Sequence, residues 1–344
     1  MTIDDQTRRR TTKTGLTALD RDRACPGYTL YSPMNGPGDV YLLNLDGEEV
    51  HHWAMPDPPG LYGYLLPNGN LFYGGKLRDE MWDRFPSWKR FKGGVMMEVD
   101  WDGNVVWEHR DQDHHHDARR TEPGGAIYLT VELMSETLAA KVKGGNPITG
   151  EDGMWADVIV EVDASGKRIW EWHAAEHLDP ERDTITFNDS RDEWSHGNTV
   201  APLPDGRVMF SFRNISTVGI IDKVSGEIVW RLGGEVLAQQ HDPSLLPNGN
   251  VLVYDNGSHS GQHPLPSPGW SRWKPAPTRS CGNTSITRPT TSSAPTYPGP
   301  AGCPTATLSS LKECLDGCFR SRLKATLSGS TSTPTTTKTP RTRW

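Results

Sequence analysis

Residues 240–257 read Gln240-His241-Asp242-Pro243-Ser244-Leu245-Leu246-Pro247-Asn248-Gly249-Asn250-Val251-Leu252-Val253-Tyr254-Asp255-Asn256-Gly257. An Asn-Gly pair between two apolar runs predicts a tight β-hairpin, because type I′ turns need positive φ at both central residues. The segment therefore predicts a strand, a turn and a second strand, with a histidine a few residues before the turn.

Two kinds of turn recur along the chain between about Tyr28 and Tyr254. The first is a Leu-Pro-x-Gly turn, found at Leu66-Pro67-Asn68-Gly69, Leu203-Pro204-Asp205-Gly206 and Leu246-Pro247-Asn248-Gly249, with Glu122-Pro123-Gly124-Gly125 as a degenerate copy. The second is an Asp-Gly or Ser-Gly turn followed by a strand that ends in Trp, found at Asp46-Gly47 to Trp53, Asp102-Gly103 to Trp107, Ser165-Gly166 to Trp170 and Ser225-Gly226 to Trp230. Two hairpins per unit predict a four-stranded sheet.

The spacing of these units predicts an all-β fold of the β-propeller type. The Trp-containing turns recur roughly 60 residues apart, longer than the about 40 to 50 residues of common propeller repeats. The extra length leaves room for loops, such as those at 76–92 and 174–192. The 35 Gly, 27 Pro and 13 Trp residues indicate many turns and bulky packing side chains,. We expect the recurring tryptophans to pack between neighbouring sheets.

Composition narrows the classes of protein to which the chain can belong. The net charge of -7 across 344 residues argues against a nucleic-acid binder,. No apolar run is long enough to span a bilayer, and residues 1–26 predict a disordered lead-in that lacks the apolar centre of a secretion signal,. Of five cysteines, only Cys25 precedes residue 281, which fits a reducing, cytoplasmic location,. The oligomeric state is left open.

The last part of the chain, residues 261–344, has a different composition from the rest. It is rich in Ser, Thr and Pro and shows no apolar alternation, which indicates a low-complexity, disordered tail,. A second interpretation is a frameshift near residues 260 to 272. Read one base out of frame, 302–307 permits Leu-Pro-Asn-Gly-Asn, and 280–284 and 327–331 each permit Val-Trp-Glu-Tyr. The propeller is thus expected over residues 27–260, with its closing blades missing or disordered.

Three histidines precede the hairpin turns at similar offsets: His116 before Pro123, His196 before Pro204 and His241 before Pro247. Propeller units are related by rotation about a central axis, so equivalent positions on the innermost strands form a ring around a channel. We therefore expect the three imidazoles to converge, although a lone buried histidine is more often structural than catalytic.

Further polar residues lie near these histidines in sequence, among them Asn198 and Arg213. A guanidinium presents a planar fork to anionic oxygens, so Arg213 facing three histidines suggests a site for a tetrahedral anion such as sulfate or phosphate. The run 114–116 could also bind a metal, with His114 and His116 on one face of a strand. No cysteine or well-spaced carboxylate completes a set of ligands. No metal site is therefore assigned.

The motifs resemble those of the bacterial arylsulfate sulfotransferases. The resemblance rests on Trp194-Ser195-His196-Gly197-Asn198, Ser211-Phe212-Arg213-Asn214, Gln240-His241-Asp242 and Asp255-Asn256-Gly257, and it extends over about residues 27–258. It implies a six-bladed propeller that moves a sulfuryl group between phenols through a sulfohistidine, without a nucleotide donor or other cofactor. Well-known members are exported and carry an N-terminal accessory β domain, for which there is no room before Gly27.

The resemblance also implies roles for individual residues. His241 matches the nucleophile, and His196, Asn198 and Arg213 match the pocket for the sulfuryl oxygens. His116 resembles a further pocket histidine, for which His115 is a weaker choice. The implied partners are an aryl sulfate and a phenol, with His116 or His196 supplying a proton to the leaving phenolate.

Two alternatives remain from the sequence. The segment from Asp222 to Trp230 resembles the docking motif of quinoprotein propellers, which would need a calcium-bound quinone and an acidic residue at the axis. A non-catalytic propeller that serves as a binding scaffold is the other alternative.

Overall fold

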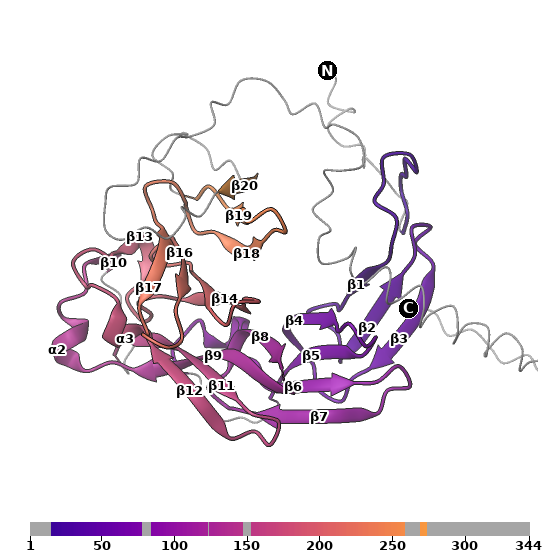
Figure 1. Ribbon diagram of the computed structural model, residues 1–344, viewed down its shortest axis with the longest axis horizontal. Coiled ribbons are helices and arrows are strands. Elements are labelled where there is room, and N and C mark those ends of the chain that lie inside the picture. Colours follow the sequence, from indigo (N-terminus) through magenta and orange to yellow (C-terminus); the bar gives the residue numbers. More distant parts are fainter. Residues whose placement is uncertain (1–14, 78–83, 123, 147–152, 259–268, 274–344) are drawn as a thin grey trace, which may run out of the picture.

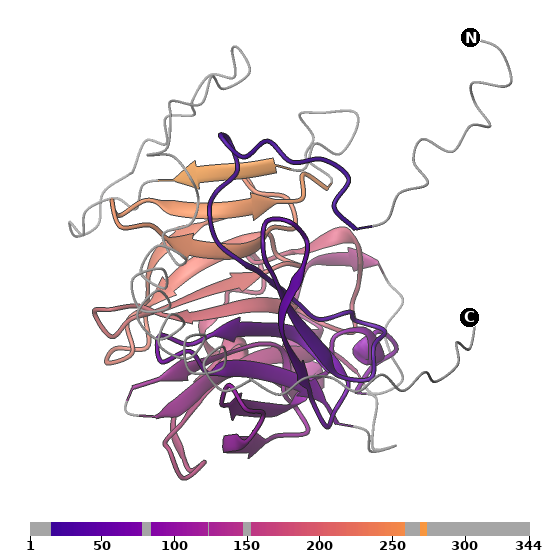
Figure 2. The ribbon, with the colours of Figure 1, turned by 90° about the vertical axis from the view of Figure 1, so that its right-hand side faces the viewer.

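The chain forms an arc of antiparallel β-sheets around a central axis (Figure 1). The computed structural model describes residues 15–77, 84–122, 124–146, 153–258 and 269–273. In the perpendicular view of Figure 2 the sheets are stacked, with the orange strands of the last sheet at the top. The predicted all-β propeller fold is confirmed.

The sheets are the blades of the propeller, and we number them in chain order. Blade 1 contains β1 (Thr29–Tyr31), β2 (Asp39–Leu43) and β3 (Glu49–Ala54). Blade 2 contains β4 (Pro59–Leu65), β5 (Leu71–Lys76), β6 (Gly94–Val99) and β7 (Val105–Arg110). Blade 3 contains β8 (His115–Thr121), β9 (Gly125–Leu133), β11 (Trp155–Val162) and β12 (Arg168–His173). Blade 4 contains β14 (Gly197–Pro202), β15 (Val208–Phe212), β16 (Thr217–Ile221) and β17 (Ile228–Leu232). Blade 5 contains β18 (His241–Leu245), β19 (Val251–Asp255) and β20 (Gly269–Trp273).

The remaining elements belong to the loops between strands. The 3-10 helix η1 spans Trp88–Arg90, and the short helices α2 and α3 span Glu136–Ala139 and Ala174–His177. Strands β10 (Gly144–Asn146) and β13 (Ile185–Ser190) pair in parallel as a small separate sheet. These insertions account for the length of the repeats.

The recurring turns occupy equivalent places in the blades. The Leu-Pro-x-Gly turns connect the first and second strands of blades 2, 4 and 5, and Gly69, Gly206 and Gly249 there have φ of 86°, 84° and 77°. The Asp-Gly and Ser-Gly turns connect the last two strands of blades 1 to 4. Because the first strand of each complete blade lies nearest the axis, the segments before the Leu-Pro-x-Gly turns line the centre.

Tryptophans on the outer strands β3, β7 and β12 join each of blades 1 to 3 to the next one. The indole N–H of Trp53 donates to the carbonyl of Asp100 at 3.0 Å, and that of Trp107 donates to Ala164 at 3.0 Å. Trp170 donates to the carbonyl of Lys223 at 3.2 Å. Each acceptor lies in the last turn of the following blade, so these tryptophans pack between sheets as expected. The turn that contains Lys223, in the segment that resembles a quinoprotein docking motif, thus accepts the hydrogen bond of Trp170.

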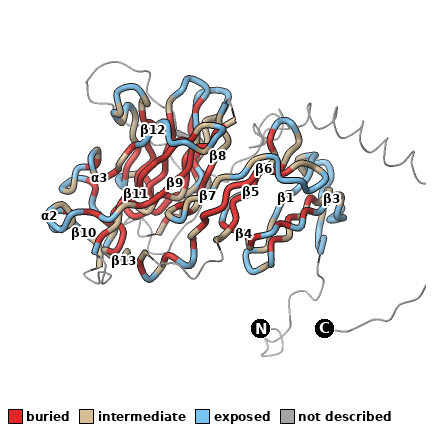
Figure 3. The backbone as a smooth tube through the Cα atoms, turned by 90° about the horizontal axis from the view of Figure 1, so that it is seen from below, coloured by how far each residue is buried: buried red, intermediate tan, exposed pale blue. Residues whose placement is uncertain are grey.

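Apolar side chains between the blades form the core. In Figure 3 the buried residues, in red, follow the strands of the blades. One cluster, including Ile159, Phe210 and Phe212, fills the space between blades 3 and 4, and all three side chains are fully buried. Corresponding clusters lie between blades 1 and 2, 2 and 3, and 4 and 5. Each blade is therefore stabilised by contacts with its neighbours.

The sequence predicts domain boundaries after residues 26 and 260. Residues 15–26 form neither helix nor strand, and 1–14 lie outside the described residues. In the expected tail, only 269–273 are described, and they form β20, so the blades extend past residue 260. The segments used for the frameshift hypothesis lie outside the described residues. None of the described helices is long and apolar enough to cross a bilayer.

Candidate active site

Each innermost strand of blades 2 to 5 begins with an irregularity in its pairing. The register shifts between Pro59 and Gly63 in β4, at the start of β8, at the start of β14 and at the start of β18. A bulge places an extra residue in one strand and turns its side chain away from the regular alternation. His116 lies within the irregular segment of β8 with φ of 51°, and His196 directly precedes β14 with φ of 50°. Their backbone conformation is uncommon for residues with a side chain.

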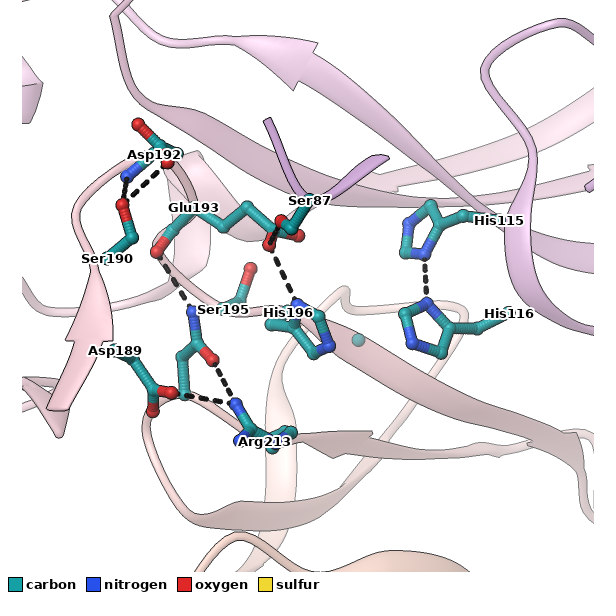
Figure 4. A network of polar contacts seen from close by, with 12 residues as sticks. Ser87, His115, His116, Asp189, Ser190, Asp192, Glu193, Ser195, His196 and Arg213 are labelled. Atoms are coloured by element: carbon teal, nitrogen blue, oxygen red, sulfur yellow. Dashed lines mark hydrogen bonds and ion pairs between the residues drawn. The ribbon is translucent and has the colours of Figure 1, made fainter. Parts of the chain in front are cut away.

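His116 and His196 face each other across the boundary between blades 3 and 4 (Figure 4). Their rings lie edge to face, with centroids 4.8 Å apart. Phe91 stacks on His116 at 4.5 Å and presents its edge to His196 at 4.8 Å, and its carbonyl accepts the His116 backbone N–H at 3.0 Å. Burial lowers the pKa of His116 well below its usual value, and nearby His196, His115 and His241 lower it further. His116 is therefore neutral near pH 7.

The pKa of His196 is shifted in the opposite direction because it has a carboxylate partner. Its Nδ1 lies 2.8 Å from Oε2 of Glu193, which also accepts from the Ser87 hydroxyl at 3.4 Å (Figure 4). Burial alone would lower the pKa of His196, but the Glu193 carboxylate outweighs burial and raises the pKa. A cationic His196 donates Nδ1–H to Glu193 and has Nε2–H left to donate to another group.

His241 begins β18, and its ring is held by Asn256, the residue that follows β19. The His241 Nδ1 lies 2.7 Å from the amide oxygen of Asn256. Because that oxygen is an acceptor, Nδ1 carries the hydrogen, and neutral His241 has its lone pair on Nε2. Burial lowers the pKa of His241, and the positive charges of Arg213 and His196 also lower it. His241 is thus a neutral imidazole with one nitrogen able to act as a nucleophile.

Arg213 and Asn198 are already engaged with neighbouring groups. The Nη1 of Arg213 lies 2.8 Å from Oδ1 of Asp189 and 3.0 Å from Oδ1 of Asn214. The amide nitrogen of Asn198 donates to the carbonyl of Gln240 at 2.8 Å. Asn198 therefore holds the backbone next to His241. The arrangement assigns it a positioning contact, and its predicted contact with substrate oxygens stays a prediction.

The structure brings four predicted residues to one place: His116 from blade 3, His196 and Arg213 from blade 4, and His241 from blade 5. Each of the three histidines has its pKa changed by at least one other member of this group. Asn198 lies beside them through Gln240. The predicted convergence on the innermost strands is therefore observed.

The run 114–116 does not alternate as a regular strand would. The bulge at His116 breaks the alternation, so the neighbouring His115 and His116 contact each other, with their Nδ1 atoms 2.8 Å apart. His114 instead accepts the backbone N–H of Gly94 at 2.8 Å. In the part of the chain that the structure describes, no group of three or more His, Cys, Asp or Glu residues is arranged to hold a metal ion.

The sequence did not point to the partners of these histidines. Phe91 lies in the predicted loop at 76–92, while Asp189 lies in the predicted loop at 174–192 and Glu193 directly follows it. Asn256 was quoted only as part of a motif. The Glu193-to-His196 spacing of three residues was the available indication, but such a spacing is common on surfaces. The length of the repeats predicts that these loops exist. Which of their side chains reach the histidines depends on how the loops pack, which the sequence does not show.

Comparisons with known proteins find distant structural likenesses and one matching family. A protein of unknown function from Bacteroides caccae has a TM-score of 0.40 and 13% identity, over 68% of this chain and 67% of that chain. The β-propeller domain of Myceliophteria thermophila Cps50 (Swd1) has a TM-score of 0.40 and 11% identity, over 77% and 73%. A virginiamycin B lyase from Staphylococcus aureus has a TM-score of 0.39 and 11% identity, over 77% and 74%. These structural likenesses are too distant to inform the function. No curated protein matches the chain.

A sequence model of one family covers half of the chain. The family is described as Arylsulfotransferase (ASST), and the match spans residues 66–237. This range includes His116, His196, Asn198 and Arg213, and it ends just before His241. The chain therefore belongs to the arylsulfotransferase family.

Proposed function

We propose that the protein transfers a sulfuryl group from an aryl sulfate to a phenol by a ping-pong reaction through a sulfohistidine at His241. Membership of the arylsulfotransferase family supports this class of reaction. The observation that carries the mechanism is the contrast between His241, whose pKa is lowered beside Asn256, and His196, whose pKa is raised by the Glu193 carboxylate 2.8 Å away.

In the first half-reaction, Nε2 of His241 attacks sulfur and the S–O bond to the donor phenol breaks. The electron pair of that bond goes to the phenolic oxygen, which takes a proton from Nε2 of His196. Phenol has an unperturbed pKa of about 10, so a phenolate leaves more readily when it is protonated. Asn256 supports the attack by holding the Nδ1–H tautomer of His241.

Arg213 stabilises the sulfuryl oxygens while bonds to sulfur form and break. Its guanidinium keeps one edge on Asp189 and Asn214 through Nη1, and a planar fork has further N–H groups to offer to an anion,. Fixed donors directed at the developing charge supply the electrostatic part of the catalysis. In the second half-reaction a phenol attacks the sulfohistidine and regenerates neutral His241.

The decisive experiment compares the full chain with its His241→Ala form, using a chromogenic aryl sulfate with and without a phenol acceptor. We expect the unmutated protein to release one equivalent of chromogenic phenol without acceptor, and to turn over when acceptor is added. Mass spectrometry of the acceptor-free reaction should find one sulfuryl group on the peptide that contains His241.

His173→Ala provides the matched control, because His173 lies on the outer strand β12 and contacts Glu132 at 3.0 Å. It should behave as the unmutated protein, whereas His241→Ala should release no phenol. If folded His241→Ala releases phenol at the unmutated rate, His241 is not the nucleophile. If the folded unmutated protein releases none, the transferase assignment is wrong and a binding scaffold is favoured.

A further inference from the structure

Three polar residues occupy equivalent positions at the ends of the second strands of blades 2, 4 and 5. Lys76, Arg213 and Asn256 each follow the glycine of their Leu-Pro-x-Gly turn by seven residues. The backbone N–H of Lys76 donates to the carbonyl of Pro58 at 2.8 Å, as that of Arg213 donates to His196 at 3.0 Å. Lys76 therefore has the place in blade 2 that Arg213 has in blade 4.

Strand alternation directs the side chain of Lys76 toward blade 3. Phe72 of β5 packs in the apolar cluster between blades 2 and 3, and β5 pairs with β6 without a register shift. Residues an even number apart in a strand share a face, so Lys76 lies on the face of Phe72. In blade 4, Phe212 packs toward blade 3, so Arg213 faces blade 5, which holds His241. Each of the two cations thus faces the next blade along the chain.

The ammonium of Lys76 lies beside the segment that leads to Phe91. Its Nζ donates to the carbonyls of Lys89 and Arg90, at 3.4 Å each. The next residue is Phe91, whose ring stacks on His116 of blade 3. Lys76 therefore brings a positive charge to the side of the histidine site that borders blade 2.

A second ammonium lies close to that of Lys76. Lys92 forms an isolated antiparallel bridge with His115 at the start of β8. Burial lowers the pKa of Lys76, and the charge of Lys92 lowers it further. Among the described lysines, Lys143 and Lys223 pair with carboxylates, whereas Lys76 and Lys92 pair with none of the described ones. Two cations held together in this way favour a bound anion.

An in-line reaction directs the aryl ring of the substrate toward blade 2. In transfer of a phosphoryl group, and equally of a sulfuryl group, the attacking and leaving atoms lie on opposite sides of the central atom. With His241 of blade 5 as the nucleophile, the aryl oxygen lies on the side of sulfur away from blade 5. Blades 3 and 4 separate blade 5 from blade 2 along the arc, so blade 2 lies across the axis (Figure 1). A substituent on the ring is thereby directed toward Lys76.

We propose that Lys76 and Lys92 form a subsite for an anionic substituent on the aryl ring, and that the preferred donors and acceptors are phenols that carry a carboxylate. This inference rests on the proposed sulfuryl transfer, and it names the class of substrate. Arg213 binds the sulfuryl oxygens on one side of the site, and Lys76 binds the ring carboxylate on the other.

The first experiment compares phenyl sulfates that carry a carboxylate or a carboxamide, each in the meta and the para position. The two substituents have the same planar shape, and only the carboxylate is charged at pH 7. The quantity measured is kcat/KM for the carboxylate divided by kcat/KM for the carboxamide. The intrinsic reactivities of the two esters cancel when this ratio is compared between variants.

We expect Lys76→Met to lower the ratio by about 10-fold for at least one of the two ring positions, as loss of a hydrogen bond to a charged group does. Lys76→Arg keeps the cation and should keep most of the ratio. Lys167→Met is the matched control, because Lys167 is exposed in the outer turn between β11 and β12, and it should match the unmutated full chain. An unchanged ratio in Lys76→Met at both positions, or equal losses in Lys76→Met and Lys76→Arg, overturns the proposal.

The second experiment measures binding without chemistry, by calorimetric titration with meta- and para-hydroxybenzoate. The unmutated protein should bind one of these isomers about 10-fold more tightly than Lys76→Met does. Equal affinities of the two proteins for both isomers overturn the subsite. If the folded unmutated protein releases phenol from none of the esters, the proposed function is contradicted instead, and the titration still decides whether the subsite exists.

Discussion

Replacing Glu193 by glutamine should lower the pKa of His196 and thereby shift the alkaline limb of the pH–rate profile to lower pH. The glutamine keeps an oxygen that can accept Nδ1–H of His196, but it removes the negative charge 2.8 Å away. Burial and the positive charge of Arg213, which both lower the pKa of His196, remain in the variant. The variant should therefore hold the proton of His196 less tightly than an exposed histidine would.

The size of the shift follows from the separation and the burial of the pair. Two unit charges 4 Å apart interact by about 4 kcal/mol at an effective dielectric constant of roughly 20. Neighbouring opposite charges shift pKa values in proteins by about 1 to 3 units, and one unit corresponds to about 1.4 kcal/mol. The His196 and Glu193 side chains are only 12% and 9% exposed, so solvent screens them little. We expect a shift of about 1 to 3 units.

The sign follows from the role of His196 as an acid. Because Glu193 raises the folded-state pKa, the cation is present below that pKa and is lost as the pH rises through it. At a pH above both values, each unit of pKa lost lowers the cationic fraction tenfold, so kcat/KM should fall by about 10- to 1,000-fold. Below the pKa of the variant the difference should disappear.

The assay is the pH dependence of kcat/KM for two donors with different leaving groups. An unactivated phenyl sulfate needs the proton most, so it should show the full loss. A nitrophenyl sulfate releases a stable phenolate and should show less. Glu132→Gln is the matched control, because Glu132 pairs with His173 at 3.0 Å away from the site. Identical alkaline limbs in the unmutated protein and Glu193→Gln, or an equal loss for both donors, would refute the reasoning.

Two further predictions concern stability. Burial raises the pKa of Asp117 to about 6, so its charged form destabilises the fold as the pH rises from about 4 through 6,. Asp117→Asn should therefore be more stable than the unmutated protein at pH 8, by up to about 2 to 3 kcal/mol in urea unfolding, and should lose that gain at pH 4. An equal difference at both pH values contradicts this. Trp107→Phe removes the indole hydrogen bond to Ala164 and weakens the contact with Arg120, whose guanidinium lies 4.1 Å from the ring centre. It should lower the free energy of unfolding by about 1 to 2 kcal/mol. The control Val106→Ala, at an exposed position, should change that free energy by less than about 0.5 kcal/mol,. Equal effects of the two substitutions would argue against the inter-blade role of the indole.

The repeated turns made the fold and much of the site predictable from the sequence. Rotational symmetry converts equal offsets before Pro123, Pro204 and Pro247 into neighbouring positions on innermost strands, so the convergence of His116, His196 and His241 could be expected. Symmetry does not describe the loops. For that reason, the sequence did not predict the contact of Phe91 with both pocket histidines.

The protonation states of the histidines were not predictable for a related reason. They depend on single hydrogen bonds from residues distant in sequence, such as the one between Asn256 and His241. A local change of conformation also matters. Strand alternation assigned His115 and His116 to opposite faces of the strand. Because His116 has a φ of 51°, the alternation is broken there and the two rings are in contact.

The pairing irregularity at the start of each innermost strand of blades 2 to 5 has a consequence for how such a protein can change. The tryptophans and the apolar clusters that join the blades lie at other positions, so a substitution at an irregular position can alter the chemistry at the axis without removing those contacts. Blade 2 has a further irregularity between Pro59 and Gly63 of β4, and β4 contacts β8, the strand that holds His116. New reactivity could thus be acquired one blade at a time, and the same position is a natural choice for introducing a further functional group by engineering.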